Sequence, residues 1–211
     1  MLQNTNGEYI FLRFSLIYYS QRMRGADMQL HNRETKLIIK ENTMNTVDRE
    51  EFTFASLPKN LEEMQALPEA GLDSPFKTAA LAVCALCTYS ADKKAGLEML
   101  NWLRGPRPLN GQEISFLDDR FRGGKTYLPF SYFLGATADN NYKPDEPFRI
   151  VIESNQTSDA EEGYKKLFIP CGGADSPRPV KLRQKGDGRW FLWEQYLLTA
   201  IRQPKAEDPW A

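Results

Sequence analysis

The chain has 211 residues, of which 41% are hydrophobic and 26% are charged. These values are those of one globular domain, or of one domain with an extension, and they exclude a wholly disordered chain. The formal net charge of −1 lacks the basic excess of most nucleic-acid-binding domains, so we do not expect a nucleic-acid partner.

The cysteines and the apolar runs of the sequence indicate the cellular compartment and whether the protein associates with a membrane. Three cysteines, Cys84, Cys87 and Cys171, are an odd number, which does not suit the disulfide framework of a small secreted protein. The N-terminus lacks the basic region and the small-residue cleavage site of a signal peptide. The apolar runs 9–19 and 76–89 are too short to span a bilayer as helices. We therefore predict a cytoplasmic protein with no membrane association.

Residues 1–43 differ in character from the rest of the chain. They contain the only histidine, His31, and show no clear amphipathic period. One interpretation is a disordered or loosely attached extension. The other is that the segment is not translated, because Lys40-Glu41 precedes Met44 by a few codons and purine-rich codons for this pair resemble a ribosome-binding sequence. A single α+β domain is predicted over residues 44–211.

The first elements of this domain are expected to be a short strand and two helices. The strand covers residues 51–55, and Asn60 caps a helix over residues 61–66. Ser74 followed by Pro75 begins a longer helix, because a capping residue precedes a proline at the first helical position. Its apolar residues cover most faces, which is typical of a buried central helix.

Two more helices are predicted after the central one. The stretch Ser90-Ala91-Asp92 restarts a helix, which Gly105-Pro106 ends. Asn110 and Glu113 form a capping box for the next helix, which places Ile114, Leu117 and Phe121 on one face.

The C-terminal part is predicted to be β-structure. Strands are expected over residues 127–133, 148–152, 164–169, 179–184 and 189–195. The sequence Lys-Gly-Asp-Gly at 185–188 joins the last two as a hairpin. Residues 197–201 either extend the last strand or form a short helix.

Helices followed by antiparallel strands indicate an α+β fold, with N-terminal helices packed on a C-terminal antiparallel sheet. The more specific expectation is a sheet that curves around the central helix, as in cystatin-like or nuclear-transport-factor-like folds. This expectation is an analogy that rests on element order alone.

Five phrases of the chain are distinctive when taken together. They are SPFKTAAL at 74–81, MLNWLRGP at 99–106, LPFSYFLGAT at 128–137, GGADSPRP at 172–179 and WFLWEQYLL at 190–198. The combination resembles an uncharacterised bacterial family that is known only as a domain of unknown function. The resemblance covers residues 51–210 and implies a bacterial origin and a compact cytoplasmic domain. It implies no activity, cofactor or catalytic residue.

The most unusual stretch is the loop Cys171–Pro179. Gly172 and Gly173 permit positive φ, so their N–H groups would cradle an anion, with Asp175 and Arg178 close by. The alternative is a structural loop with Asx and proline turns between two strands.

Aromatic residues are concentrated in the C-terminal half. An outward-facing cluster of them would bind a peptide, a sugar or a flat ligand, whereas inward-facing ones form the core. Asp139 and Asp175 are the acids expected near candidate pockets. The candidate ligand-binding residues are therefore Gly172, Gly173, Asp175, Arg178, Tyr132, Asp139 and Tyr142.

Two other patterns have simple structural explanations. Cys84 and Cys87 have the C-x-x-C spacing of zinc and redox sites, but they lie in an apolar helix without further ligands, so we expect core residues and no metal. Lys181, Arg183 and Lys185 alternate with other residues along a strand. They form a solvated face, or else a surface for an acidic protein or nucleic acid.

Three kinds of function remain open, and no cofactor is expected. We favour a non-catalytic binding or interaction domain for a protein or small-molecule ligand, because no nucleophile–base, metal or phosphate-loop motif is present. The first alternative is a hydrolase or isomerase that uses a pocket carboxylate, Asp139 or Asp175, with tyrosines. The second is homo-oligomeric assembly through the outer face of the sheet. The sequence leaves the ligand and the oligomeric state undetermined.

Overall fold

Helix α4 (Pro75–Ala91) is the central element of the fold. In the computed structural model, which describes residues 47–208 and 210, every residue from Thr78 to Tyr89 is buried. The hydroxyl oxygen of Ser74 accepts a hydrogen bond from the Phe76 amide, so the predicted start of this helix is confirmed. A helix without an exposed face has to be enclosed by other elements.

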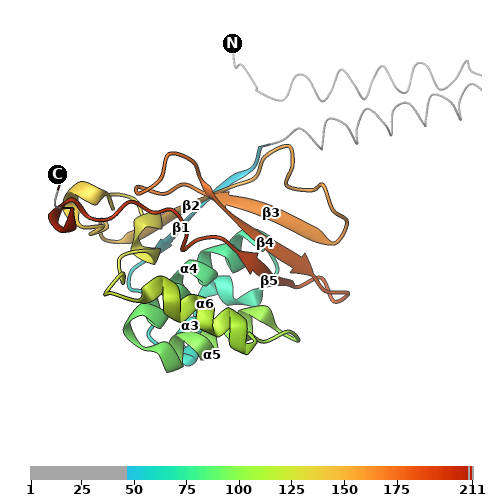
Figure 1. The fold of residues 1–211 in the computed structure, drawn as a ribbon. Coiled ribbons are helices and arrows are strands. Elements are labelled where there is room, and N and C mark those ends of the chain that lie inside the picture. Colours follow the sequence, from blue (N-terminus) through green and yellow to red (C-terminus); the bar gives the residue numbers. More distant parts are fainter. Residues whose placement is uncertain (1–46, 209, 211) are drawn as a thin grey trace, which may run out of the picture. The chain divides into compact units, whose positions relative to one another are not determined.

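A five-stranded antiparallel sheet lies against α4, with its strands in the order β1-β2-β3-β4-β5 (Figure 1). The strands are β1 (Arg49–Phe54), β2 (Phe148–Glu153), β3 (Tyr164–Ile169), β4 (Arg178–Gln184) and β5 (Trp190–Gln195). Helix α4 contacts all five of them. The side chains that meet it alternate along the strands and are fully buried, as with Ile150, Leu167 and Leu182.

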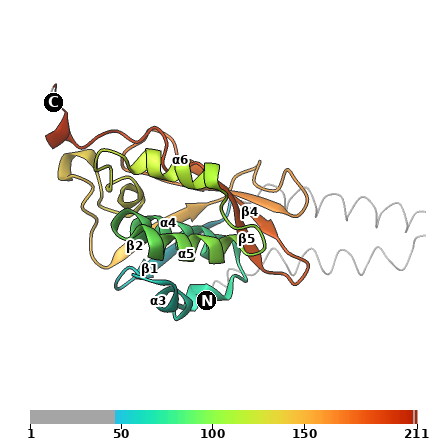
Figure 2. The same ribbon diagram turned by 60° about the horizontal axis from the view of Figure 1, so that its bottom comes forward.

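The other helices are α3 (Leu61–Gln65), α5 (Lys93–Arg104) and α6 (Gly111–Phe121). They lie on the same side of the sheet as α4 (Figures 1 and 2). Asn60 and Asn110 cap α3 and α6 through their side chains, as predicted, and the Asp92 side chain caps α5. The α+β class is therefore confirmed. One strand, β1, precedes the helices, and the other four follow them.

The prediction of a strand at 127–133 is wrong. These residues form turns and the short 3₁₀ helix η2 (Pro129–Tyr132), and only Phe133 makes a β-bridge, to Ile150. Pro129 cannot donate to a sheet ladder but suits the first position of a helical turn, and the Ser131 hydroxyl closes that turn by donating to the Leu128 carbonyl. Residues 197–201 neither extend β5 nor form a helix, since residues 197–200 form turns and bends and residue 201 has no regular structure.

Two irregular segments pack together beside the sheet. One contains η3 (Ala138–Asn140), the other contains η4 (Lys205–Glu207), and the two lie side by side at the edge of the domain (Figure 1). A further 3₁₀ helix, η1 (Pro68–Gly71), precedes α4.

Residues 46–211 form one compact unit. The predictions made for residues 1–43 lie outside the described residues. Of the helices that the structure describes, none has the length and apolar character to cross a membrane.

Candidate binding groove beside strand β5

The predicted ligand-binding residues lie close together, but their polar groups bind the C-terminal segment of the same chain. The Tyr132 hydroxyl donates to the Leu197 carbonyl, and the Tyr142 hydroxyl donates to the Arg202 carbonyl at 2.7 Å. Arg178 donates to the carbonyl oxygens of Thr199 and Ala200, at 3.1 and 2.7 Å. Five cavities on the described surface are lined by other residues. A ligand-binding role for this set stays a prediction.

The two glycines of the loop serve close packing. Neither Gly172 nor Gly173 has a positive φ. The amide of Gly172 donates to the Ser131 carbonyl at 2.9 Å, and the amide of Gly173 donates to the Cys171 sulfur at 3.3 Å. Because both N–H groups have partners inside the protein, the expected anion cradle is not formed.

The two acids expected in a pocket lie at the surface. The carboxylates of Asp139 and Asp175 are 66% and 92% exposed and pair with Lys205 and Arg202. The hydrogen bond from Arg202 lowers the pKa of Asp175, and burial raises the pKa of Tyr142 to about 12. The alternative of an enzyme that uses a pocket carboxylate with tyrosines requires one of these aspartates to lie in a pocket, and both carboxylates are exposed instead.

The cysteines of the central helix belong to the core. Cys84 and Cys87 are buried, and desolvation raises the pKa of both thiols. A buried thiol with a raised pKa stays protonated, which is typical of an unreactive core cysteine. In the part of the chain that the structure describes, no group of three or more His, Cys, Asp or Glu side chains is placed to hold a metal ion.

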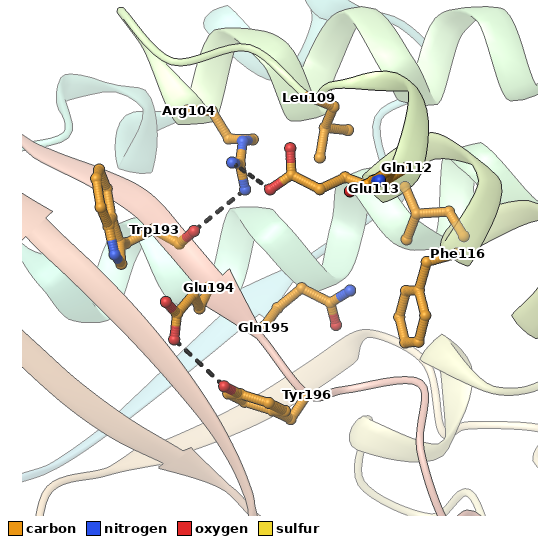
Figure 3. A pocket seen from close by; sticks show the side chains of 10 residues that line it. Arg104, Leu109, Gln112, Glu113, Phe116, Trp193, Glu194, Gln195 and Tyr196 are labelled. Atoms are coloured by element: carbon orange, nitrogen blue, oxygen red, sulfur yellow. Dashed lines mark hydrogen bonds and ion pairs between the residues drawn. The ribbon is translucent and has the colours of Figure 1, made fainter.

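A groove of about 320 Å³ opens between α6 and the end of β5 (Figure 3). Helix α6 and the turn before it supply one wall, and the last residues of β5 with Tyr196 supply the other. The lining combines apolar side chains, two carboxylates, two amides and one arginine: Arg104, Leu109, Gln112, Glu113, Phe116, Leu117, Trp193, Glu194, Gln195 and Tyr196.

The base of the groove is held by Arg104, the last residue of α5. Its side chain is only 4% exposed and donates to Glu113 Oε1 at 2.7 Å, to the Trp193 carbonyl at 3.2 Å and to the Arg107 carbonyl at 3.0 Å. Burial lowers the pKa of this guanidinium, and the charge of Glu113 opposes that effect. Arg104 thus joins α5, α6 and β5, as Figure 3 shows in part.

Glu113 fixes the first turn of α6. Its Oε2 atom accepts from the Asn110 amide at 2.9 Å and completes the capping box, while Oε1 accepts from Arg104 and, at 3.4 Å, from Arg107. Because both carboxylate oxygens already accept hydrogen bonds, Glu113 positions the helix wall and is poorly placed to take a proton from a ligand.

Exposed aromatic side chains stand at the mouth of the groove. Phe116 on α6 is 40% exposed and Tyr196 after β5 is 49% exposed, and Figure 3 shows them on its two sides. The described residues have only two other exposed large hydrophobic side chains, Val47 and Trp210. The Tyr196 hydroxyl donates to Glu194 at 3.3 Å. Two of the four exposed large hydrophobic side chains of the described residues therefore flank this groove.

Sequence reasoning missed this groove, although part of its signal was visible. The predicted apolar face of α6 consists of Ile114, Leu117 and Phe121, and Phe116 lies off that face. An aromatic residue such as Phe116 on the polar side of an amphipathic helix is the sequence signal that indicates an exposed contact surface. Nothing local indicated that the end of β5 would lie opposite it.

Residues 56–205 match the model of the family described as "Domain of unknown function (DUF6935)". The chain belongs to this family. The match contains all residues of the groove, so the groove is part of the DUF6935 domain. No curated protein and no solved structure matches the chain. The resemblance to a domain of unknown function is confirmed, while the bacterial origin and the cystatin-like or nuclear-transport-factor-like fold stay predictions.

Proposed function

We propose that the DUF6935 domain of this chain is a non-catalytic binding module that holds a segment of another protein in the groove between α6 and β5. One observation carries the proposal. Phe116 and Tyr196 present two exposed aromatic surfaces on either side of a hollow whose base is fixed by the ion pair of the buried Arg104 with the half-buried Glu113. A preformed apolar hollow with a rigid base reduces the entropy lost on binding.

The charges of the groove indicate the chemistry of the segment. Glu194 is exposed, and no ion pair joins it to a cation of the described residues, whereas Glu113 is neutralised by two arginines. A segment with an apolar side chain beside a lysine or arginine would pack on Phe116 and pair with Glu194. The amides of Gln112 and Gln195 offer donors and acceptors to its backbone.

A cytoplasmic location belongs to the same proposal. All three cysteines are free thiols, two of them in the core. Free thiols persist in a reducing compartment, which supports a cytoplasmic interaction partner.

Selection of random linear peptides on the full-length protein tests this function. We expect the enriched peptides to combine an apolar residue with a neighbouring basic one and to bind saturably in fluorescence polarisation. Phe116→Ser and Tyr196→Ser should each weaken that binding about tenfold or more, since central aromatic contacts dominate such interfaces. Glu194→Gln should weaken the preference for the basic residue.

The matched control is Val47→Ser, because Val47 is 62% exposed and does not line the groove. This variant should bind the selected peptides like the unmodified protein. Failure to enrich any peptide, or binding that is indifferent to both Phe116→Ser and Tyr196→Ser, would overturn the proposal.

A further inference from the structure

A second cavity, of about 420 Å³, lies between the β4–β5 hairpin and the connection from α5 to α6. It shares Arg104 and Trp193 with the groove, but its chemistry differs. Its lining contains four cations and two aromatic side chains and no carboxylate: Arg104, Arg107, Arg183, Lys185, Phe191 and Trp193. Cations that converge on one hollow repel one another unless an anion lies between them.

Trp193 holds two of these cations in place. The guanidinium carbon of Arg107 lies 4.5 Å from the centre of the Trp193 ring, and that of Arg183 lies 4.7 Å from it. Arg183 also lies 5.4 Å from the ring of Tyr164. Contact with aromatic faces positions the Arg183 guanidinium without a hydrogen-bonded carboxylate, so its N–H donors stay available for a ligand. Arg107 also donates to Glu113 at 3.4 Å, through one of its terminal nitrogens.

The neighbouring carboxylates do not neutralise the cavity. Glu113 is shared by Arg104 and Arg107, and Asp187 is shared by Lys185 and Arg189. No ion pair is formed by Arg183 within the described residues, and this residue is exposed. The cavity therefore has a surplus of positive charge greater than one, which favours a doubly charged anion over a single carboxylate.

We propose that this cavity binds the phosphate group of a small molecule. The planar guanidinium groups of Arg107 and Arg183 match the spacing of phosphate oxygens and can donate two hydrogen bonds each. The aromatic side chains of Phe191 and Trp193 form an apolar wall for the organic part of the ligand. Arg107 and Arg183 do not line the peptide groove, although Arg104 and Trp193 line both hollows.

Titration of the full-length protein with inorganic phosphate and with phenyl phosphate, at constant ionic strength, tests the site. Calorimetry should show saturable binding of both, with phenyl phosphate the tighter. Arg107→Gln and Arg183→Gln should each weaken binding about tenfold or more, because each removes charge-assisted hydrogen bonds.

Two controls separate this site from other effects. Arg149→Gln removes an arginine of β2 that pairs with Glu51, outside the cavity, and should leave the affinity unchanged. Phe116→Ser, which alters the groove, should also leave it unchanged. Absence of saturable binding, or binding that survives Arg183→Gln undiminished, would overturn the proposal. Equal affinities for the two probes would contradict the apolar wall.

Discussion

Residues of the loop after β3 show how tightly backbone segments pack in this domain. A Cβ atom on Gly172 would lie 1.8 Å from the Ala136 carbonyl oxygen, and one on Gly173 would lie 2.5 Å from the Tyr142 hydroxyl. Real Cβ atoms do not approach backbone oxygens this closely. Absence of a side chain is therefore what allows this loop, the segment around η3 and the C-terminal segment to meet.

Gly172→Ala should destabilise the protein by about 3 kcal/mol or more, because backbone has to shift to admit the methyl group. The matched control is Gly186→Ala in the β4–β5 hairpin, where a Cβ would meet no atom within 4 Å. That variant should change the free energy of unfolding by less than about 0.5 kcal/mol. Urea denaturation measures both, and equal effects of the two substitutions would contradict this account of the loop.

Among the elements, helix α6 is positioned chiefly by its first turn. Asn110 Oδ1 accepts from the amides of Gln112 and Glu113, at 3.0 and 2.9 Å, and the Glu113 carboxylate returns a bond to Asn110. Gln112 and Glu113 also line the groove. The cap therefore fixes one wall of the groove as well as the start of the helix.

Asn110→Ala should lower the free energy of unfolding by about 1 kcal/mol, since the helix loses a side-chain cap. It should also weaken peptide binding in the groove, whereas Asn110→Asp should preserve both properties. Glu98→Ala, at an exposed position of α5, is the control and should be close to neutral. Thermal denaturation and peptide titration check these outcomes. If Asn110→Ala lowered the free energy of unfolding as little as Glu98→Ala does, the cap would be dispensable.

At the scale of the whole domain, Arg104 connects the helical layer to the edge of the sheet. Its guanidinium binds Glu113 of α6 and the backbone of Trp193 in β5, and it is almost fully buried. The neighbouring Arg107 binds the same carboxylate at 3.4 Å but is 45% exposed. The two arginines therefore bind the same carboxylate at very different depths.

Arg104→Met should destabilise the domain by about 3–5 kcal/mol, because it leaves buried acceptors without their donor. Arg107→Gln, the matched control, removes an exposed ion pair and should cost less than about 1 kcal/mol. Guanidinium denaturation of both variants measures the difference. If both variants lost a similar free energy of unfolding, the burial of Arg104 would add nothing to the connection between the helices and the sheet.

Assembly through the outer face of the sheet stays a prediction. It requires a large apolar patch, and β4 presents Lys181 and Arg183 on the face opposite its buried Val180 and Leu182. Lys181 pairs with Glu161 across this face. A charged face of this kind also discourages pairing between sheets of different molecules.

By itself, the sequence determined the class of the fold and the starts of its helices. Ser74-Pro75 and the box of Asn110 and Glu113 act within a few residues. The same holds for the Lys185–Gly188 turn, whose ends are joined by a hydrogen bond from the Gly188 amide to the Lys185 carbonyl. The strand expected at 127–133 is not formed, because Pro129 lacks the N–H group that a sheet ladder needs and begins a 3₁₀ turn instead.

Only the tertiary structure decided where a ligand would bind. Phe116 and Tyr196 are 80 positions apart in the chain, and they meet at one groove because Arg104 joins α6 to β5. Tyr132, Tyr142 and Arg178 are among the predicted ligand-binding residues, but their side chains bind carbonyl groups of a segment that begins at Leu197. Contacts between distant segments depend on how whole elements pack, and no local pattern of residues encodes those positions.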